Sequence, residues 1–109
     1  MTILIVSMLQ DAHAQAVMRA LASQGERNVE LLDLSEFPTR LCLSMAFGRK
    51  GRQLILTRSG SGHRCIVDLD RVTSVWWRRP QPFALARDLT DLAARRFALS
   101  ESATAFAGL

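Results

Sequence analysis

The sequence is poor in the residues that build metal and disulfide sites. It has only two cysteines, Cys42 and Cys65, and two histidines, His13 and His63. The cysteines lie in strand-like segments without metal-ligand spacing, so we predict that both are buried, reduced core residues of a cytoplasmic protein. Neither histidine has the neighbours that a catalytic triad or a zinc site requires. We therefore predict no metal site and no catalytic residue in this chain.

Long hydrophobic runs and nucleotide motifs are also missing. A run such as Ile3–Val6 is too short to cross a membrane, and the N-terminus lacks the pattern of a secretory signal. Residues 48–51 lack the P-loop frame, and no glycine fingerprint follows the first apolar run. With 109 residues, 49% of them hydrophobic, the chain suits one domain over residues 1–109.

Acidic residues are absent from residues 37–67, although the whole chain has ten. The same segment holds six basic residues: Arg40, Arg49, Lys50, Arg52, Arg58 and Arg64. A stretch of one charge favours an acidic partner. Thirteen of the fourteen basic residues are arginine, which suits bidentate binding of carboxylates but is also typical of a coding bias.

Hydrophobic periodicity indicates an α/β fold. Residues 2–7 form a continuous apolar run that predicts a buried strand, and Asp11 then offers an N-cap for a helix that ends near Gly25. Residues 29–32 predict a second strand, parallel to the first. Short β-type segments at 41–47, 53–57 and 64–67 alternate with glycine-rich turns, which predicts an antiparallel meander.

The last third of the chain predicts one more strand and one more helix. Residues 72–77 should form a third parallel strand, ended by two prolines, and a helix should run from about 90 to 107. Leu92, Leu99, Ala103 and Phe106 share one apolar stripe of this helix, and Asp91 and Arg95 are spaced as an ion pair. The predicted fold has three parallel strands, an antiparallel β-meander insertion and two main helices.

The run Val75–Pro80 is the strongest candidate for a binding site. Its adjacent Arg78 and Arg79 stand at the carboxyl end of a strand, where α/β sheets bind ligands, and can grip a carboxylate or phosphate. Consecutive strand residues face opposite sides, so we expect one of Trp76 and Trp77 in the core and the other semi-exposed. A purely structural alternative has both indoles in the core and both arginines in solvent.

These motifs together resemble the N-terminal pre-ATP-grasp domain of microviridin-type (MvdD-like) graspetide ligases, which are ATP-grasp ribosomal peptide maturases. The resemblance rests on the Ile3–Val6 strand, the loop with Asp11, residues 32–38, residues 41–44 and above all residues 74–80, which are similar to a family Val-Trp-Tyr-Arg-Arg-Pro motif. It implies a small Rossmann-like pre-ATP-grasp domain within a longer ligase. Trp77 stands where the family has tyrosine, so a role of that hydroxyl is lost.

The resemblance implies a function for the parent enzyme. Such a ligase uses ATP and magnesium to phosphorylate an Asp or Glu side chain of a precursor peptide, and a Ser, Thr or Lys side chain then forms an ester or amide cross-link. The catalytic lobes would follow this domain, which would support the cleft and bind acidic substrate through Arg78, Arg79 and Trp77. A stand-alone module that binds an acidic peptide or single-stranded nucleic acid is the alternative, and a homodimer is compatible with both.

Overall fold

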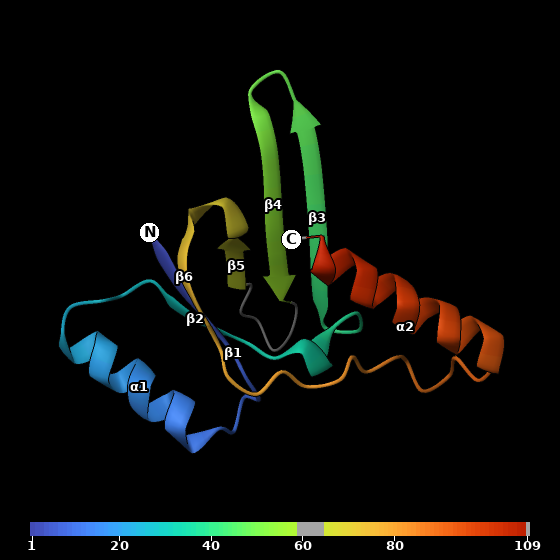
Figure 1. The fold of residues 1–109 in the computed structure, drawn as a ribbon, viewed down its shortest axis with the longest axis horizontal. Coiled ribbons are helices and arrows are strands. Elements are labelled where there is room, and N and C mark those ends of the chain that lie inside the picture. Colours follow the sequence, from blue (N-terminus) through green and yellow to red (C-terminus); the bar gives the residue numbers. More distant parts are fainter. Residues whose placement is uncertain (59–64, 109) are drawn as a thin grey trace.

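A three-stranded parallel sheet forms the centre of the fold. The computed structural model describes residues 1–58 and 65–108, and in it β1 (Thr2–Val6) lies between β2 (Val29–Leu32) and β6 (Val72–Trp77). Val6 is paired with Leu32 on one side and with Trp77 on the other, so the three strands end at the same level. The predicted parallel arrangement of these strands is confirmed (Figure 1).

Helix α1 (Ala12–Ser23) covers one face of this sheet. It begins at Asp11, whose side chain accepts a hydrogen bond from the backbone N–H of His13. Beyond the helix, Gly25 has a φ of 90°, a left-handed conformation that glycine adopts without strain. Ile5 and Leu31 are buried beneath Ala14 of the helix, and Trp76 packs against this cluster. Both faces of β1 are covered, which explains its continuous apolar sequence.

A second, antiparallel sheet lies against the other face. It consists of β3 (Leu41–Gly48), β4 (Gly51–Arg58) and β5 (Cys65–Asp68), in that order, which confirms the predicted meander. A two-residue turn joins β3 to β4, and Gly51 after it has a φ of 110°. The second predicted turn, at residues 59–62, lies outside the described residues. Leu41 and Leu56, at the base of the hairpin, pack on Leu4 and Val6 of the parallel sheet.

The prediction of a buried Cys42 is wrong. Cys42 is a free, exposed thiol, whereas its neighbour Leu41 is buried and Leu43 is partly buried. Successive side chains of a strand point to opposite faces, and only the face of β3 with Leu41 and Leu43 meets the core. The side chain of Cys65 is outside the described part of the structure.

Helix α2 (Leu92–Ala107) follows a connecting segment, residues 78–91. Asp91 caps the helix by accepting from the backbone N–H of Ala94, and the side chain of Arg95 donates to the carbonyl of Leu89 at 2.7 Å instead of pairing with Asp91. Of the predicted apolar stripe, Phe106 packs on the core, with Phe37 at a ring distance of 4.8 Å. Leu92 and Leu99 of the stripe are exposed.

Two short 3₁₀ helices connect the layers. Helix η1 (Leu34–Glu36) follows β2, and η2 (Leu69–Arg71) links β5 to β6. Each begins at an aspartate, Asp33 or Asp68, whose carboxylate accepts a hydrogen bond from the backbone two residues later. The fold is thus the predicted mixture of a parallel sheet, an antiparallel sheet and two main helices.

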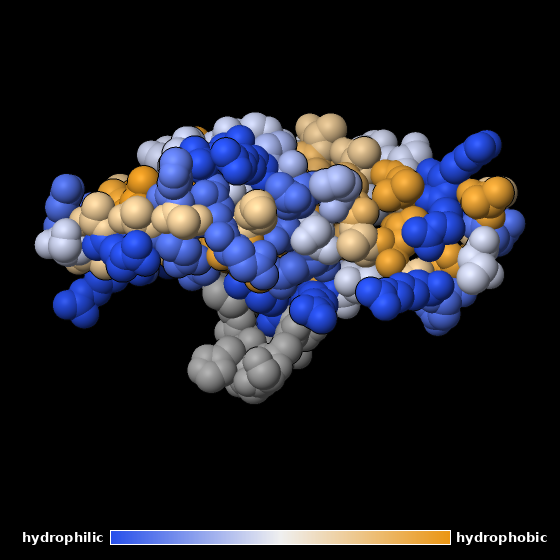
Figure 2. Space-filling model, turned by 90° about the horizontal axis from the view of Figure 1, so that it is seen from below, coloured by the Kyte–Doolittle hydropathy of each residue, from blue (hydrophilic) through white to orange (hydrophobic). Residues whose placement is uncertain are grey.

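The molecule is more extended than a typical domain of its length. Its radius of gyration is 15.1 Å, against about 13 Å expected for 109 residues. The β3–β4 hairpin and α2 project in different directions from the sheets (Figure 1). Both projections carry exposed apolar residues, with Phe47 of the hairpin 76% exposed, and Figure 2 shows hydrophobic and hydrophilic residues interspersed on one face. Within the described residues, no helix is long and apolar enough to span a membrane.

Candidate functional site

The carboxyl ends of the three parallel strands bring together segments that are far apart in the sequence. Ser7 follows β1, Asp33 follows β2 and Arg78 follows β6, and the register of the strands sets them side by side. We call this region, formed by residues 7–11, Asp33 and residues 78–79, the carboxyl edge. Ligands of α/β sheets bind at such an edge, where loops and not strands present the side chains.

Asp11, which is buried, and Arg78, which is partly buried, form an ion pair in the carboxyl edge. Arg78 Nε donates to Asp11 Oδ2 at 2.6 Å, and the hydroxyl of Ser7 donates to the same oxygen at 2.6 Å. The bond from Arg78, followed by that from Ser7, holds the pKa of the Asp11 carboxyl well below its usual range. Asp11 therefore stays ionised at any physiological pH, and it joins the start of α1 to the end of β6.

The backbone at the end of β6 is equally constrained. The amides of Arg78 and Arg79 both donate to the carbonyl of Val6, at 3.0 and 3.2 Å. The guanidinium of Arg78 also lies 5.3 Å from the ring centroid of Trp76, within cation–π range. The Arg78 side chain is only 19% exposed, and its bond to Asp11 uses one of five N–H donors.

Arg79 differs from Arg78 in its surroundings. Its side chain is exposed and has no hydrogen-bond or ion-pair partner among the described residues. The two neighbouring arginines therefore have separate positions: Arg78 is held inside the carboxyl edge and Arg79 stands at its surface. The sequence predicted both as ligands of an acidic group, and their geometry leaves Arg79 as the unpaired cation.

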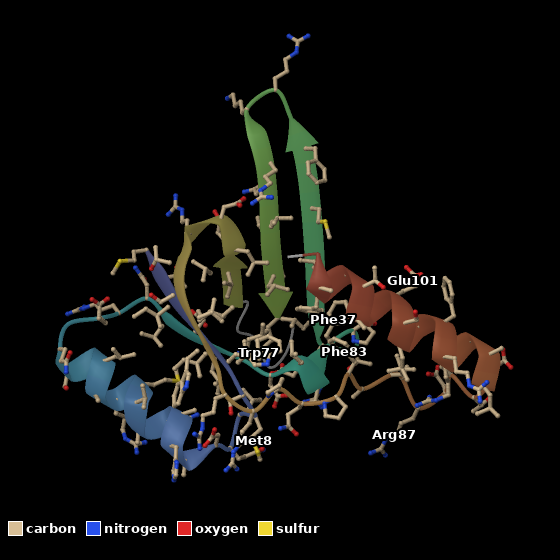
Figure 3. All side chains as sticks on the ribbon, viewed as in Figure 1. Met8, Phe37, Trp77, Phe83, Arg87 and Glu101 are labelled. Carbon is tan, nitrogen blue, oxygen red and sulfur yellow. The ribbon has the colours of Figure 1, made fainter. Side chains whose placement is uncertain are left out.

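The loop between β1 and α1 is fixed by Asp33, which the sequence marks only as part of the family-like turn at residues 32–38. Asp33 is buried, and its carboxylate accepts from the backbone N–H of Leu9 at 3.1 Å and from the hydroxyl of Ser35 at 2.6 Å. The sequence signal for this role is the position of Asp33 directly after a buried strand. These bonds set the position of the loop that carries Met8, seen below the sheet in Figure 3.

Trp77 lies on the face of the sheet opposite α1. It is 61% exposed, whereas Trp76 packs under α1, so the prediction that the two indoles part to opposite faces is confirmed. Trp77 lines an apolar groove of about 350 Å³ together with Val6, Val75 and Phe106. Figure 3 shows Trp77 between the parallel sheet and the aromatic side chains of Phe37 and Phe83.

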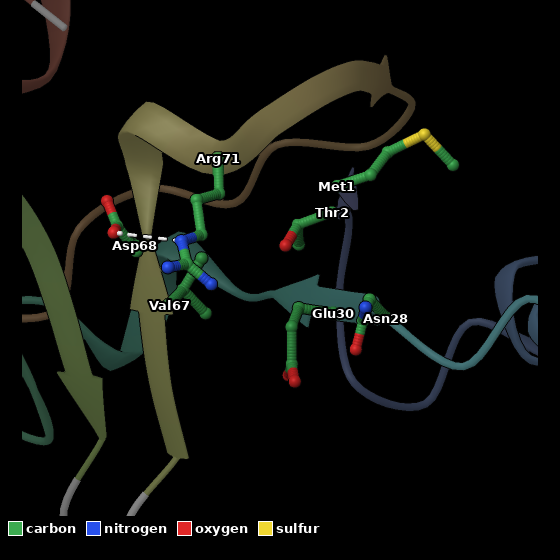
Figure 4. Close-up of a pocket in the computed structure, with 7 residues that line it drawn as sticks. All are labelled: Met1, Thr2, Asn28, Glu30, Val67, Asp68 and Arg71. Carbon is green, nitrogen blue, oxygen red and sulfur yellow. Dashed lines mark ion pairs between the residues drawn. The ribbon is translucent and has the colours of Figure 1, made fainter.

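A polar hollow of about 240 Å³ lies at the opposite, amino end of the sheet (Figure 4). Arg71 in this hollow is paired with Asp68 at 3.6 Å, and Glu30 also has an interaction partner. The hollow is remote from Arg79 and its charged groups are already engaged. Its lining consists of Met1, Thr2, Asn28, Glu30, Val67, Asp68 and Arg71.

The described residues contain no group of three or more His, Cys, Asp or Glu side chains that could hold a metal ion. His13 is exposed in the first turn of α1, and His63 lies outside the described residues. Asp68 and Asp70 are engaged with Arg71 and Arg52.

Comparison with protein families decides the identity of the domain. The model of the MvdD pre-ATP grasp domain matches residues 2–109, nearly the whole chain. The chain belongs to this family of pre-ATP-grasp domains. The resemblance inferred from residues 74–80 is thereby confirmed. A comparison with curated proteins finds no relative.

Solved structures of two macrocyclases contain the same fold. The chain is similar to the macrocyclase MdnC of Microcystis aeruginosa MRC, solved with the precursor peptide MdnA, with a TM-score of 0.78 and 26% identity over 99% of this chain and 34% of that one. It is similar to the macrocyclase MdnB of the same organism, with a TM-score of 0.78 and 25% identity over 98% and 33%.

A third solved structure agrees in fold alone. The RiPP-associated ATP-grasp ligase of Chryseobacterium gregarium, solved with ADP and a leader and core peptide, has a TM-score of 0.78 and 19% identity over 99% of this chain and 32% of that one. The pre-ATP-grasp domain thus spans about a third of the length of each of these proteins.

Proposed function

We propose that this pre-ATP-grasp domain is the N-terminal domain of an ATP-dependent ligase that cross-links side chains of a ribosomally made precursor peptide. The family of the domain supports this assignment, as does its similarity to two macrocyclases. The parent enzyme would use ATP and Mg²⁺ bound outside this domain to activate a carboxyl side chain. A hydroxyl or amino side chain of the same peptide would then replace the phosphate and form an ester or an amide.

In this proposal the domain holds acidic residues of the peptide at the carboxyl edge. The observation that carries it is the exposed, unpaired guanidinium of Arg79, two residues after Trp77, whose indole is also exposed. A guanidinium binds a carboxylate with two parallel hydrogen bonds, and an exposed indole adds apolar contact area next to it. Arg78 can also bind the carboxylate, through the N–H donors that its hydrogen bond to Asp11 does not use.

The proposal is tested in the ligase that contains this domain, with its precursor peptide and ATP. We expect Arg79→Gln to raise the KM for the peptide about tenfold or more, because a charged hydrogen-bond partner of the substrate is lost. Arg19→Gln is the matched control, since Arg19 is exposed on α1, away from the carboxyl edge. Cross-links are counted by mass spectrometry as the loss of one water each. Unchanged peptide KM and cross-link number in Arg79→Gln would refute the role of Arg79.

A further inference from the structure

Strand β6 is an open edge of the parallel sheet. It pairs with β1 on one side, and no described strand pairs with its other side. The amide of Arg78 donates to Val6, and bonding in a parallel pair alternates along the strand, so Trp76 and Ser74 face β1. The N–H and C=O groups of Val75 and Trp77 therefore point outward, away from β1.

This edge lacks the features that keep sheet edges from pairing with other chains. Natural edge strands carry charges, prolines or bulges that hinder the addition of a strand. Residues 74–77 of β6 contain no charged residue and no proline, and they lie beyond the register shift at the start of the strand. Val75 and Trp77 are 56% and 61% exposed although both favour strands. An apolar, unprotected edge of this kind is suited to accept a further strand.

The surroundings of the edge specify the chemistry of its occupant. The apolar groove lies beside Val75 and Trp77, on the face opposite α1, and can receive an apolar side chain. Arg79, whose side chain has no partner among the described residues, follows the strand at its carboxyl end. An extended peptide along β6 would direct alternate side chains into the groove and bring the residue at one end to Arg79.

We propose that β6 binds an extended segment of the precursor peptide by strand addition, with an apolar side chain in the groove and an acidic side chain on Arg79. Main-chain hydrogen bonds to Val75 and Trp77 supply affinity, and the groove and Arg79 supply selectivity. The inference rests on the proposed function, which provides the peptide, but it concerns a separate feature, the backbone of the edge.

The test uses the 109-residue chain and two fluorescein-labelled probes, Thr-Val-Thr-Val-Thr-Glu-Glu and Glu-Glu-Thr-Val-Thr-Val-Thr, because the strand can add in either direction. Binding is measured by fluorescence anisotropy. We expect Val75→Pro to weaken binding of one probe about tenfold or more, since proline removes an outward donor and blocks approach to the edge. Val75→Thr, which is β-branched and keeps its N–H, should bind like the unmodified chain.

A backbone-modified probe gives the same information without a protein variant. N-methylation of alternate residues of the probe removes its main-chain donors but keeps every side chain. We expect the methylated probe to lose binding in one of the two methylation registers and to keep it in the other. This result would hold even if Val75→Pro failed to fold, which far-UV circular dichroism reports.

The outcomes separate this inference from the proposed function. Loss of binding in Arg79→Gln, or when glutamine replaces glutamate in the probe, supports recognition of an acidic peptide but not, by itself, strand addition. If Arg79 matters but Val75→Pro and both methylated probes bind normally, strand addition is refuted and the proposed function stands. If the chain binds neither probe, no peptide of this kind occupies the edge and the inference fails. If the chain forms a dimer that Val75→Pro dissociates, a second copy of the chain occupies the edge and the inference fails as well.

Discussion

The ion pair between Arg58 and Glu36 offers a quantitative test of how the two sheets are joined. Arg58 Nε lies 3.0 Å from Glu36 Oε2, and Arg58 Nη2 donates to the carbonyl of Leu31 at 2.7 Å. One guanidinium thus connects the end of β4 with η1 and β2. The side chains of Arg58 and Glu36 are 27% and 9% exposed, and neither Glu36 Oε1 nor Arg58 Nε makes a hydrogen bond in the described part of the chain.

Arg58→Met keeps the length of the side chain but leaves the carboxylate of Glu36 buried without its cation. Removing one partner of a buried pair costs about 3–5 kcal/mol, and we expect the lower end because Arg58 is partly exposed. For a domain of this size, a loss of about 3 kcal/mol lowers the Tm by roughly 12 °C. The double variant Glu36→Leu/Arg58→Met should lie within about 1 kcal/mol of the unmodified chain, since no unpaired charge remains.

The measurement is urea unfolding of the 109-residue chain, followed by tryptophan fluorescence. Arg52→Met is a matched control on the same strand, because Arg52 pairs with Asp70 at 3.3 Å but is 64% exposed. Its loss should cost less than about 1 kcal/mol. The reasoning is wrong if Arg58→Met costs no more than Arg52→Met, or if the double variant is as unstable as the single one.

Three further predictions concern other parts of the chain. The pKa of Asp11 is depressed in the folded chain, so the stability that its charge contributes is present above about pH 4, the ordinary pKa of an aspartate, and is lost as the pH falls below that value. The difference in urea midpoint between the unmodified chain and Asp11→Asn should therefore shrink between neutral pH and pH 3. Gly51→Ala should lower the free energy of unfolding by about 1 kcal/mol or more, since a φ of 110° is strained for alanine, and Gly48→Ala serves as the comparison because Gly48 has no positive φ. Cys42 should react rapidly with a thiol reagent in the native state, and Cys42→Ser should remove one fast-reacting thiol; equal rates in the two proteins would contradict the exposure of Cys42.

Local patterns in the sequence predicted the strands well. The apolar run at residues 2–7, the second strand at 29–32 and the alternation in the middle segment each correspond to an observed strand, because burial on one or both faces imposes a period that the sequence displays. The turn before Gly51 was equally visible, since its backbone conformation demands glycine.

Features that depend on distant residues were not predictable in the same way. Asp11 was recognised as a helix cap, but its bond to Arg78 joins residues 67 positions apart and has no local signal. The stripe on α2 was expected from spacing, yet the helix contacts the core mainly at Phe106, so Leu92 and Leu99 stay exposed. Burial of Cys42 was inferred from residue type, whereas the side of β3 that meets the core decides it.

The position of β1 in the middle of the parallel sheet has a consequence for the order of folding. β1 is the first strand of the chain, and one of its two partners, β6, begins 70 residues later at Val72. During synthesis the β3–β4 hairpin can form between strands that are adjacent in the sequence. One side of β1, in contrast, stays unpaired until β6 has left the ribosome. Closing such a long loop is slow compared with hairpin formation. We therefore expect the carboxyl edge, which needs both Asp11 and Arg78, to be among the last parts of the domain to form.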